Sequence, residues 1–326
     1  MLKYYSWAVA EKTLSVVPFG DRVYHAASLV ANAGTRSERR LAGCMSAYEL
    51  VRKAYEMTPR GGTVLDVGTG WHHHDVILLF LLGDYRFHLF DVEDKARLPY
   101  LRTYFRYLLR IVDELEREIG VDRKIATEKL SFLLSLPSRE AIYRACNFTL
   151  HITTDTDRPF LPEGSVDFMV SNCVLSHIPP HIVEPELVAL RRMLRPGGAM
   201  YVMVGHDDHW AFHDPRANRF NYYRYSEEFY RLLFHTRFEY QNRLVRSEWE
   251  PIFRRAGLRV SHYLGDWNEA SIREVRALPH IDPHFRQFPI EELATAHSFF
   301  LLTHADAVPD QPPPREAREM AELPVA

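Results

Sequence analysis

A chain of 326 residues that is 46% apolar and 25% charged has the composition of a globular protein and is long enough to bury a sizeable core. Its formal net charge of −3 argues against a protein that binds DNA or RNA by general attraction to phosphate, because such proteins carry a clustered basic excess. Three cysteines without a CxxC pair exclude a disulfide framework and a cysteine zinc knuckle, which favours a reducing, cytoplasmic setting.

The first 60 residues are predicted to form a helical cover, because their apolar residues recur at helical spacing without strand-like alternation. Charged residues at Glu11 and Lys12 interrupt the start of the chain, so we expect no secretory signal. The longest apolar run in the whole sequence, Val76 to Leu82, has seven residues, whereas a membrane span needs about 20. We therefore expect no membrane partner.

Residues 61–304 are predicted to form one domain in which strands alternate with helices. The apolar, β-branched runs that indicate strands lie at the start of 63–70, before its glycines, and at 86–92, 148–153, 166–172, 199–205, 258–264 and 297–304. Helices are expected directly after the first strand, at about 185–194 and at 248–257. This order predicts an α/β fold with a Rossmann-like, doubly wound, mostly parallel sheet, whose ligands bind beyond the carboxyl ends of the strands.

Two insertions and a tail complete the predicted organisation. Residues 95–147 read as a helical insertion, with one long amphipathic helix from Leu98 to Ile119, a second through Leu136 and a third opened by Pro137. The RPGG sequence at 195–198 is read as a turn, and the proline-rich, acidic residues 305–326 as a disordered tail.

Residues 206–248 read as an aromatic lid over the sheet. Such a lid could enclose an aromatic or amphipathic small molecule and clamp its acid group with Arg219, Arg224 or Arg243. The alternative is an ordinary packed insertion.

The first strand is followed by a glycine turn with Gly68 and Gly70, which allows the backbone to approach a ligand closely. A dinucleotide fingerprint would require a third glycine at position 73, where the chain has His73. The carboxylate of Asp66, directly before the turn, would repel a pyrophosphate but attract an ammonium or sulfonium group.

The segment VLDVGTGWH resembles the first motif of class I S-adenosylmethionine-dependent methyltransferases, with His72 where a third glycine is usual. Asp91 ends the next strand, 23 residues after Gly68, where the family has an acid that binds both ribose hydroxyls. Asp155, with Asp157 as the alternative, lies where the family has an acid that meets the adenine amino group. The stretches DRPFLPEGSVDFMVSNCVLSHI and LRRMLRPGGAMYV are similar to later family segments, so the resemblance covers residues 63–204.

The resemblance implies S-adenosyl-L-methionine as cofactor and methylation of a small molecule, at oxygen or nitrogen, as the activity. The residues implied in cofactor binding are Asp66, Gly68, Thr69, Gly70, Asp91, Val92, Asp155, Thr156, Asn172 and Cys173. The alternatives are a regulatory protein that binds the cofactor without turnover, and a nicotinamide-dependent oxidoreductase. The sequence leaves open whether the chain forms a homodimer.

Histidines cluster at 72–74 and at 206–213, next to aspartates. We expect no metal there, because the side chains of adjacent residues point in different directions. His209 instead follows the fifth strand, and an imidazole paired with a carboxylate is suited to accept a proton from a hydroxyl or amine. The sequence therefore predicts His209 as general base, with Asp208 orienting its ring and His177 behind them. The alternative is that these histidines have no chemical role.

Overall fold

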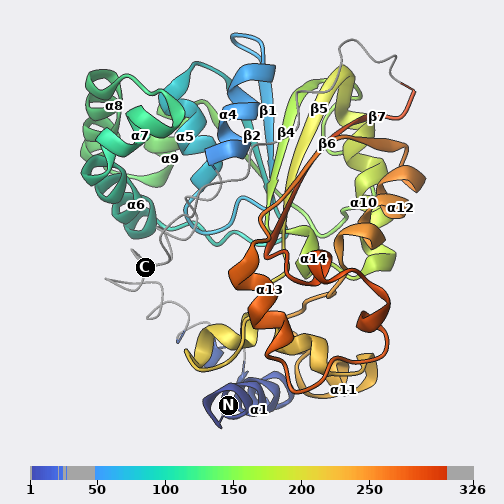
Figure 1. Ribbon diagram of the computed structural model, residues 1–326. Coiled ribbons are helices and arrows are strands. Elements are labelled where there is room, and N and C mark those ends of the chain that lie inside the picture. The colour runs from blue at the N-terminus through green and yellow to red at the C-terminus, as the bar shows by residue number, and fades with distance from the viewer. Residues whose placement is uncertain (1, 21, 25–26, 28–47, 307–326) are drawn as a thin grey trace. The chain divides into compact units, whose positions relative to one another are not determined.

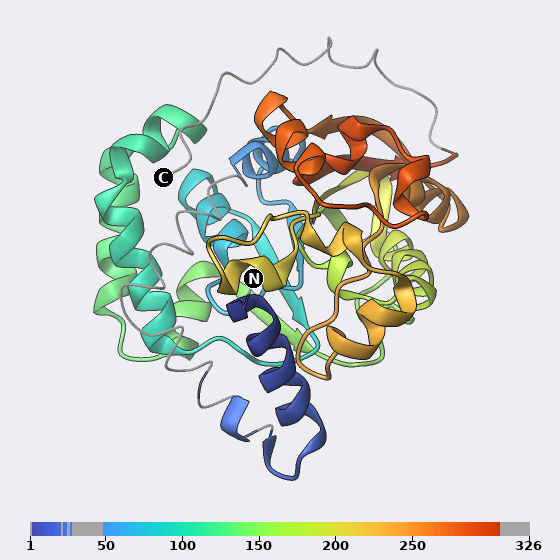
Figure 2. The same cartoon turned by 60° about the horizontal axis from the view of Figure 1, so that its bottom comes forward.

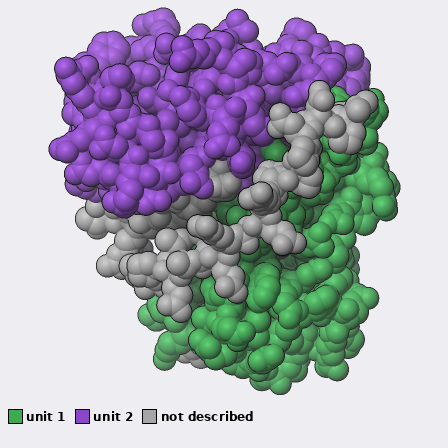
Figure 3. Space-filling view, turned by 45° about the horizontal axis from the view of Figure 1, so that its top comes forward, with its two compact units in different colours: residues 1–24, 175–184, 203–326 green, residues 25–174, 185–202 purple. Residues whose placement is uncertain are grey.

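The computed structural model describes residues 2–20, 22–24, 27 and 48–306. The chain divides into two compact units, which are described separately (Figure 3). Unit 1 comprises residues 1–24, 175–184 and 203–326, and unit 2 comprises residues 25–174 and 185–202. Part of the predicted helical cover, 28–47, and nearly all of the predicted tail, 307–326, lie outside the described residues.

Seven strands of the described chain form one sheet in the order β3-β2-β1-β4-β5-β7-β6 (Figure 1). Their bounds are β1 (Thr63–Val67), β2 (Arg86–Asp91), β3 (Phe148–Ile152), β4 (Val166–Asn172), β5 (Leu194–Gly205), β6 (Leu258–Gly265) and β7 (His297–His304). β1 pairs in parallel with β2 and β4, β2 pairs in parallel with β3, and β6 runs antiparallel to β7. This topology confirms the predicted Rossmann-like, mostly parallel sheet.

The strand order reverses at β1, which has β2 on one side and β4 on the other. Every residue of β1 is buried, as expected for a parallel strand covered on both faces. Because ligands of doubly wound sheets bind beyond the carboxyl ends of the strands at such a reversal, the turn after β1 is the part of unit 2 in which a ligand site is expected.

The helices of unit 2 flank the strands of that unit. They are α4 (Tyr48–Met57), α5 (His74–Leu82), α6 (Leu98–Arg110), α7 (Val112–Ile119), α8 (Arg123–Ser135) and α9 (Arg139–Cys146). Within the insertion, α6, α7 and α8 pack against one another, and α8 also contacts α5 (Figure 1). The side chains of Asp122 and Ser138 accept hydrogen bonds from the first turns of α8 and α9, which explains where these two helices begin.

The helix predicted to run unbroken over 98–119 is divided at Ile111. This residue has φ −108° and ψ 17°, and its N–H bonds back to Leu108 and Tyr107. The buried positions keep steps of three and four across the break, so the apolar periodicity did not reveal it.

Two further boundaries differ from the prediction. Helix α10 (Pro180–Met193) begins before Pro185, because Pro180 occupies the first helical position, where its missing N–H is not needed. Strand β5 begins at Leu194 and includes the RPGG sequence that was predicted as a turn. Gly197 adopts φ +77°, a left-handed conformation that glycine accepts without strain.

In unit 1, α1 (Leu2–Val16) packs along η3 (His209–His213) and contacts α11 (Glu227–Leu233) (Figure 2). The remaining elements of this unit besides β6 and β7 are η2 (Leu175–His177), η4 (Asn221–Arg224), α12 (Arg246–Arg255), α13 (Glu269–Arg276), η5 (Phe285–Gln287) and α14 (Ile290–Leu293). Helix α12 corresponds to the helix predicted at 248–257.

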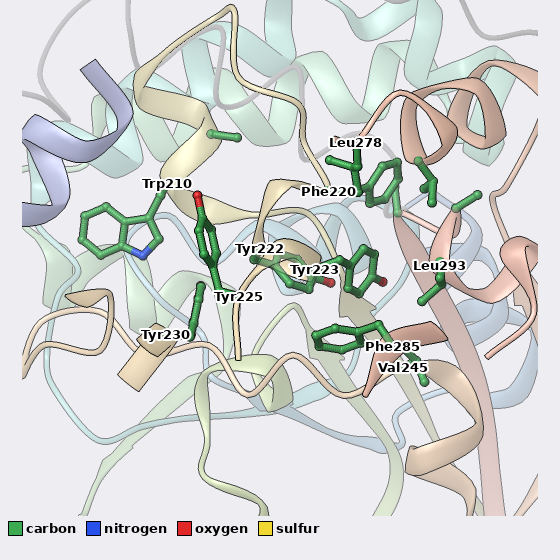
Figure 4. Close-up of a cluster of buried hydrophobic side chains, with 14 of the residues drawn as sticks. Trp210, Phe220, Tyr222, Tyr223, Tyr225, Tyr230, Val245, Leu278, Phe285 and Leu293 are labelled. Atoms are coloured by element: carbon green, nitrogen blue, oxygen red, sulfur yellow. The ribbon is translucent and has the colours of Figure 1, made fainter. Parts of the chain in front are cut away.

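Most aromatic residues of 206–248 belong to a buried cluster in unit 1, as the alternative of a packed insertion predicted (Figure 4). The buried members are Trp210, Phe220, Tyr222, Tyr223, Tyr225, Tyr230 and Phe234. Their rings pack on one another, with centroids 4.4 Å apart for Tyr222 and Tyr223. Spacing in the sequence did not separate a packed core from a pocket, because both need the same apolar side chains.

The three arginines predicted to clamp a substrate are bonded within unit 1. Arg243 is buried and donates to the carbonyl oxygens of Tyr222 and Tyr225. Arg219 pairs with Glu274 at 3.0 Å. Arg224 donates to the side chain of Asn221 at 2.9 Å. These guanidinium groups stabilise the insertion itself.

Candidate functional site

The glycine turn after β1 is anchored to the end of β2. The N–H groups of Gly68 and Thr69 both donate to the carbonyl oxygen of Phe90, at 2.8 and 3.0 Å. The N–H of Gly70 donates to Oδ2 of Asp91 at 2.9 Å. Both glycines have positive φ, +76° and +60°, which a residue with a Cβ rarely adopts. The turn therefore has the left-handed backbone conformation for which glycine is suited, and the close approach to a ligand stays a prediction.

Asp91 is buried at the carboxyl end of β2, and both of its carboxylate oxygens are engaged. Besides the bond to Gly70, its Oδ1 accepts from the N–H of Glu93 at 3.2 Å. A carboxylate oxygen has more than one lone pair, so these bonds orient the group while leaving acceptor capacity for a ligand with two adjacent hydroxyls.

Asp66 is buried beneath the turn, where its carboxyl group meets that of Asp75 on α5. Burial raises the pKa of both groups, and for Asp66 the charge of Asp75 raises it further while a hydrogen bond from Thr69 lowers it. Asn172, at the end of β4, donates to Oδ1 of Asp75 at 3.2 Å. Three of the predicted cofactor residues, Asp66, Thr69 and Asn172, thus belong to one polar network in unit 2. Asp75 was not predicted as part of it.

His73 ties the turn to the helical insertion. Its Nδ1 lies 2.6 Å from Oγ1 of Thr69, and its Nε2 lies 2.7 Å from the hydroxyl of Tyr143 on α9. Burial lowers the pKa of His73 to about 4, so the ring is neutral and can bond on both sides. His73 was not predicted to have this role, because nothing in the spacing of the chain links it to Tyr143, 70 residues away.

The other predicted cofactor residues are placed less tightly. Asp155 is exposed and pairs with Arg158 at 3.6 Å. Val92, directly after Asp91, is 50% exposed, as an apolar residue that contacts a flat ligand would be. Cys173, directly after β4, has φ +56°. Thr156 forms a hydrogen bond with Glu186. Burial raises the pKa of Glu186 to about 7. The adenine contact of Asp155 stays a prediction.

A second polar group lies in unit 1, where His177, His209 and Glu239 converge. His177 ends η2 and His209 begins η3, while Glu239 lies in the segment between α11 and α12. The Nδ1 of His209 is 2.8 Å from Oε1 of Glu239, and the Nδ1 of His177 is 3.5 Å from the same oxygen. The two imidazole rings lie 4.7 Å apart between centroids.

The carboxylate that orients His209 is therefore Glu239, where the sequence predicted Asp208. Asp208 is buried and accepts from the hydroxyl of Tyr4 at 2.7 Å and from the N–H of Trp210 at 3.0 Å. It caps η3, because its side chain accepts a hydrogen bond from the first turn of the helix that follows it. No sequence signal identified Glu239, which is 30 residues from His209.

Charge favours an ionised Glu239. Burial alone would raise the pKa of its carboxyl, but hydrogen bonds from His177 and His209 outweigh burial and hold that pKa well below its usual range. Of the other histidines in the predicted cluster, His206 is buried on Ser298 at 2.9 Å and His213 stacks on Trp7. Among the described residues, His177, His209 and Glu239 are the group with spacing suited to a metal ion.

Comparisons with known proteins give one family. The chain matches the methyltransferase domain family over residues 37–263. No protein of curated function matches it. None of the helices in the described part of the chain has the length and apolar character to span a bilayer.

Several solved structures are similar to the chain. A geranyl diphosphate methyltransferase in complex with GPP and sinefungin is 12% identical, with a TM-score of 0.42 over 79% of this chain and 76% of that chain. The geranyl diphosphate C-methyltransferase of Streptomyces coelicolor A3(2) is 9% identical, with a TM-score of 0.41 over 82% and 83%. A TehB-like protein of Corynebacterium glutamicum ATCC 13032 is 12% identical, with a TM-score of 0.37 over 87% and 96%.

Proposed function

The chain belongs to the class I S-adenosylmethionine-dependent methyltransferase family, and from that premise we propose that it methylates an oxygen or nitrogen atom of a small molecule. The observation that carries the proposal is the position of Asp91, whose buried carboxylate ends β2 and is joined to the glycine turn through the N–H of Gly70. Two acceptor oxygens at that position suit the two hydroxyls of the cofactor's ribose.

The cofactor supplies a methyl group on a positively charged sulfur. The protein must hold donor and acceptor in line and allow the acceptor to lose its proton, so positioning supplies much of the rate. In unit 2, the turn residues Gly68 to Gly70 and the carboxylate of Asp91 would bind the nucleoside. The network of Asp66, Thr69 and Asn172 would fix the conformation of the turn.

We assign the acceptor side of the reaction to unit 1. The histidine group follows β4 and β5 in the chain, with His177 five residues after Asn172 and His209 four residues after Gly205. An imidazole held by a carboxylate promotes proton loss from a hydroxyl or amine. The proton of the acceptor would leave through the group formed by His177, His209 and Glu239.

Replacement of Asp91 tests the donor site. Asp91→Ala removes the acceptors for two ribose hydroxyls, and charge-assisted hydrogen bonds are worth about 1.5–3 kcal/mol each. We expect the affinity for S-adenosylmethionine, measured by isothermal titration calorimetry, to fall at least about tenfold. Asp91→Asn, which keeps one carbonyl oxygen, should fall between Asp91→Ala and the wild type.

The matched control is Glu93→Gln, which changes an exposed carboxylate two residues away and should leave binding unchanged. An unaltered dissociation constant in a folded Asp91→Ala protein would contradict the assignment. Titration with NAD in parallel covers the alternative cofactor, and binding of NAD without S-adenosylmethionine would refute the proposed function.

A further inference from the structure

His177, His209 and Glu239 have the spacing of ligands around one metal ion. One ligand atom of each lies within 4.8 Å of the other two. The separations of 2.8 and 3.5 Å between the two Nδ1 atoms and Oε1 of Glu239 are the informative distances. Neighbouring ligands about 2.1 Å from an ion lie about 3.0 Å apart in octahedral geometry and about 3.4 Å apart in tetrahedral geometry. Small side-chain adjustments would therefore suffice to enclose an ion.

The segment that carries Glu239 is bonded to the segment that carries His177. Asn242 donates its backbone N–H to the carbonyl oxygen of Ser176 at 2.9 Å. Its side-chain Nδ2 donates to the carbonyl oxygens of Leu175 and Ile178, at 2.8 and 3.0 Å. One asparagine thus binds three backbone carbonyl groups on either side of His177, and none of these bonds involves the imidazole.

The same segment is bonded to the loop that carries His209. The Nε2 of Gln241 donates to the carbonyl oxygen of Asp207 at 2.6 Å. Gln241 is buried, and its Oε1 accepts from the hydroxyl of Tyr230 in the aromatic core. The two histidines and the glutamate are therefore brought together by bonds that do not depend on their contact with one another. Such outer support is typical of sites that orient metal ligands in advance.

We propose that His177, His209 and Glu239 bind one divalent transition-metal ion in unit 1, with coordination positions left open for an oxygen atom of the methyl acceptor. Two imidazoles and one carboxylate suit ions such as Zn²⁺, Fe²⁺, Mn²⁺ or Co²⁺ better than Ca²⁺ or Mg²⁺, which prefer oxygen ligands. Three protein ligands leave at least one position free. Metal binding stands on the geometry alone, and only the acceptor clause rests on the proposed function.

This inference replaces the expectation that no metal is bound. That expectation concerned contiguous histidines, and the ligands inferred here are far apart in the chain. It also changes the role of His209, because an imidazole nitrogen that binds a metal ion is not free to accept a proton. Proton loss from the acceptor to solvent water would then follow from coordination of its oxygen, which lowers the pKa of that hydroxyl. The oxygen would form its bond to the methyl carbon as the bond from that carbon to the sulfonium sulfur breaks.

Cobalt is the probe for the test, because Co²⁺ absorbs visible light and reports its own ligands. The full-length chain, free of any histidine tag and stripped of metal with a chelator, is titrated with CoCl₂ in the absence of S-adenosylmethionine. We expect one Co²⁺ per chain and displacement of the visible band by an equivalent of ZnCl₂. His209→Ala and Glu239→Gln should lower the affinity for Co²⁺ at least about tenfold.

His213→Ala is the matched control, since His213 lies on the same short helix as His209 and outside the cluster. His177→Ala is the ligand variant whose fold is least at risk, because the His177 side chain is 42% exposed. It keeps the test valid if a variant of a more buried ligand fails to fold. Circular dichroism checks the fold of each protein.

Absence of stoichiometric binding of Co²⁺, Zn²⁺ and Mn²⁺ by the wild type overturns the proposal, and so does equal binding in the three ligand variants. Loss of cofactor binding with Co²⁺ binding intact would count against the methyltransfer proposal and leave the metal site standing.

Discussion

His209 is the residue on which the acceptor side of the proposed reaction depends most. Its ring is held by Glu239 at 2.8 Å and lies beside the ring of His177. Either as a proton acceptor or as a metal ligand, it contributes a nitrogen lone pair that no other residue type at this position would supply in the same geometry. Its removal should therefore affect the chemical step and leave the cofactor site of unit 2 unaffected.

We expect His209→Ala to lower the rate of methyl transfer by about 10²–10⁴ while the dissociation constant of S-adenosylmethionine stays unchanged. The assay follows release of S-adenosylhomocysteine over a panel of hydroxyl- and amine-bearing small molecules at saturating cofactor. Glu239→Gln should reproduce part of the loss, and Asp208→Asn should not, because Asp208 does not contact the ring. A wild-type rate in the His209 variant would show that the proton leaves by another path.

The turn between β1 and α5 has little freedom to change. Gly68 has φ +76°, and a Cβ built on it would lie 2.2 Å from Cγ2 of Val174. Gly61, just before β1, has a similar φ of +69°, but a Cβ there meets nothing within 4 Å. A side chain at Gly61 would therefore cause backbone strain alone, whereas a side chain at Gly68 would cause both backbone strain and a steric clash.

Alanine at each glycine should give different losses of stability. A left-handed alanine costs about 1–2 kcal/mol, so Gly61→Ala should lower the free energy of unfolding by about that amount. Gly68→Ala adds overpacking, which typically costs about 1–3 kcal/mol more, and it should also weaken cofactor binding. Urea unfolding measures both, and Val174→Ala should recover part of the loss in the Gly68→Ala protein. Equal costs at both glycines would refute the steric argument.

Elements whose ends carry a local chemical signal were predicted more accurately than the others. The buried β-branched residues of β1 and the glycines after it mark that strand and turn, and Gly257, with φ +77°, follows the end of α12 as expected. Ile111 has no such signal, because it is apolar like its neighbours and the break preserves their spacing. Local composition thus explains the sheet, whereas the division of the insertion depends on packing.

Acid should destabilise the whole molecule, because each unit contains a histidine that is buried in its neutral form. Burial lowers the pKa of His73 in unit 2 and of His206 in unit 1 to about 4 each, from 6.5. The unfolded chain binds these protons below about pH 6.5 and the native chain only below about pH 4. Their contribution to stability is therefore complete above pH 6.5 and is lost as the pH falls through 4.

Replacement of one histidine separates its contribution to the pH dependence of stability from that of groups with the opposite effect. Asp208 is such a group, because burial raises its pKa to about 7. The free energy of unfolding, measured with urea, should fall between pH 7.5 and pH 5.0 in both proteins. We expect this fall to be about 2 kcal/mol smaller in His206→Gln than in the wild type. His181→Gln, which removes an exposed imidazole, is the control. Identical pH dependence in all three proteins would contradict the argument.

The two parts of the candidate site differ in how far the sequence predicted them. Gly68, Gly70 and Asp91 lie at strand ends within one stretch of chain, so motif spacing placed them together. Glu239 could not be found this way, because it meets His177 through a turn that is held by long-range hydrogen bonds. Asp208 was chosen for its adjacency to His209, and adjacent side chains diverge.

The bonds of Asn242 have a consequence for how the protein is made. Its side chain reaches back 67 residues to the carbonyl oxygen of Leu175. On the ribosome, the segment around His177 emerges well before Asn242, so its carbonyl groups are hydrated while the strands of unit 2 can already pair. The histidine group therefore cannot form until the strands of unit 2 have been made, and the protein acquires its second polar site later than the turn after β1.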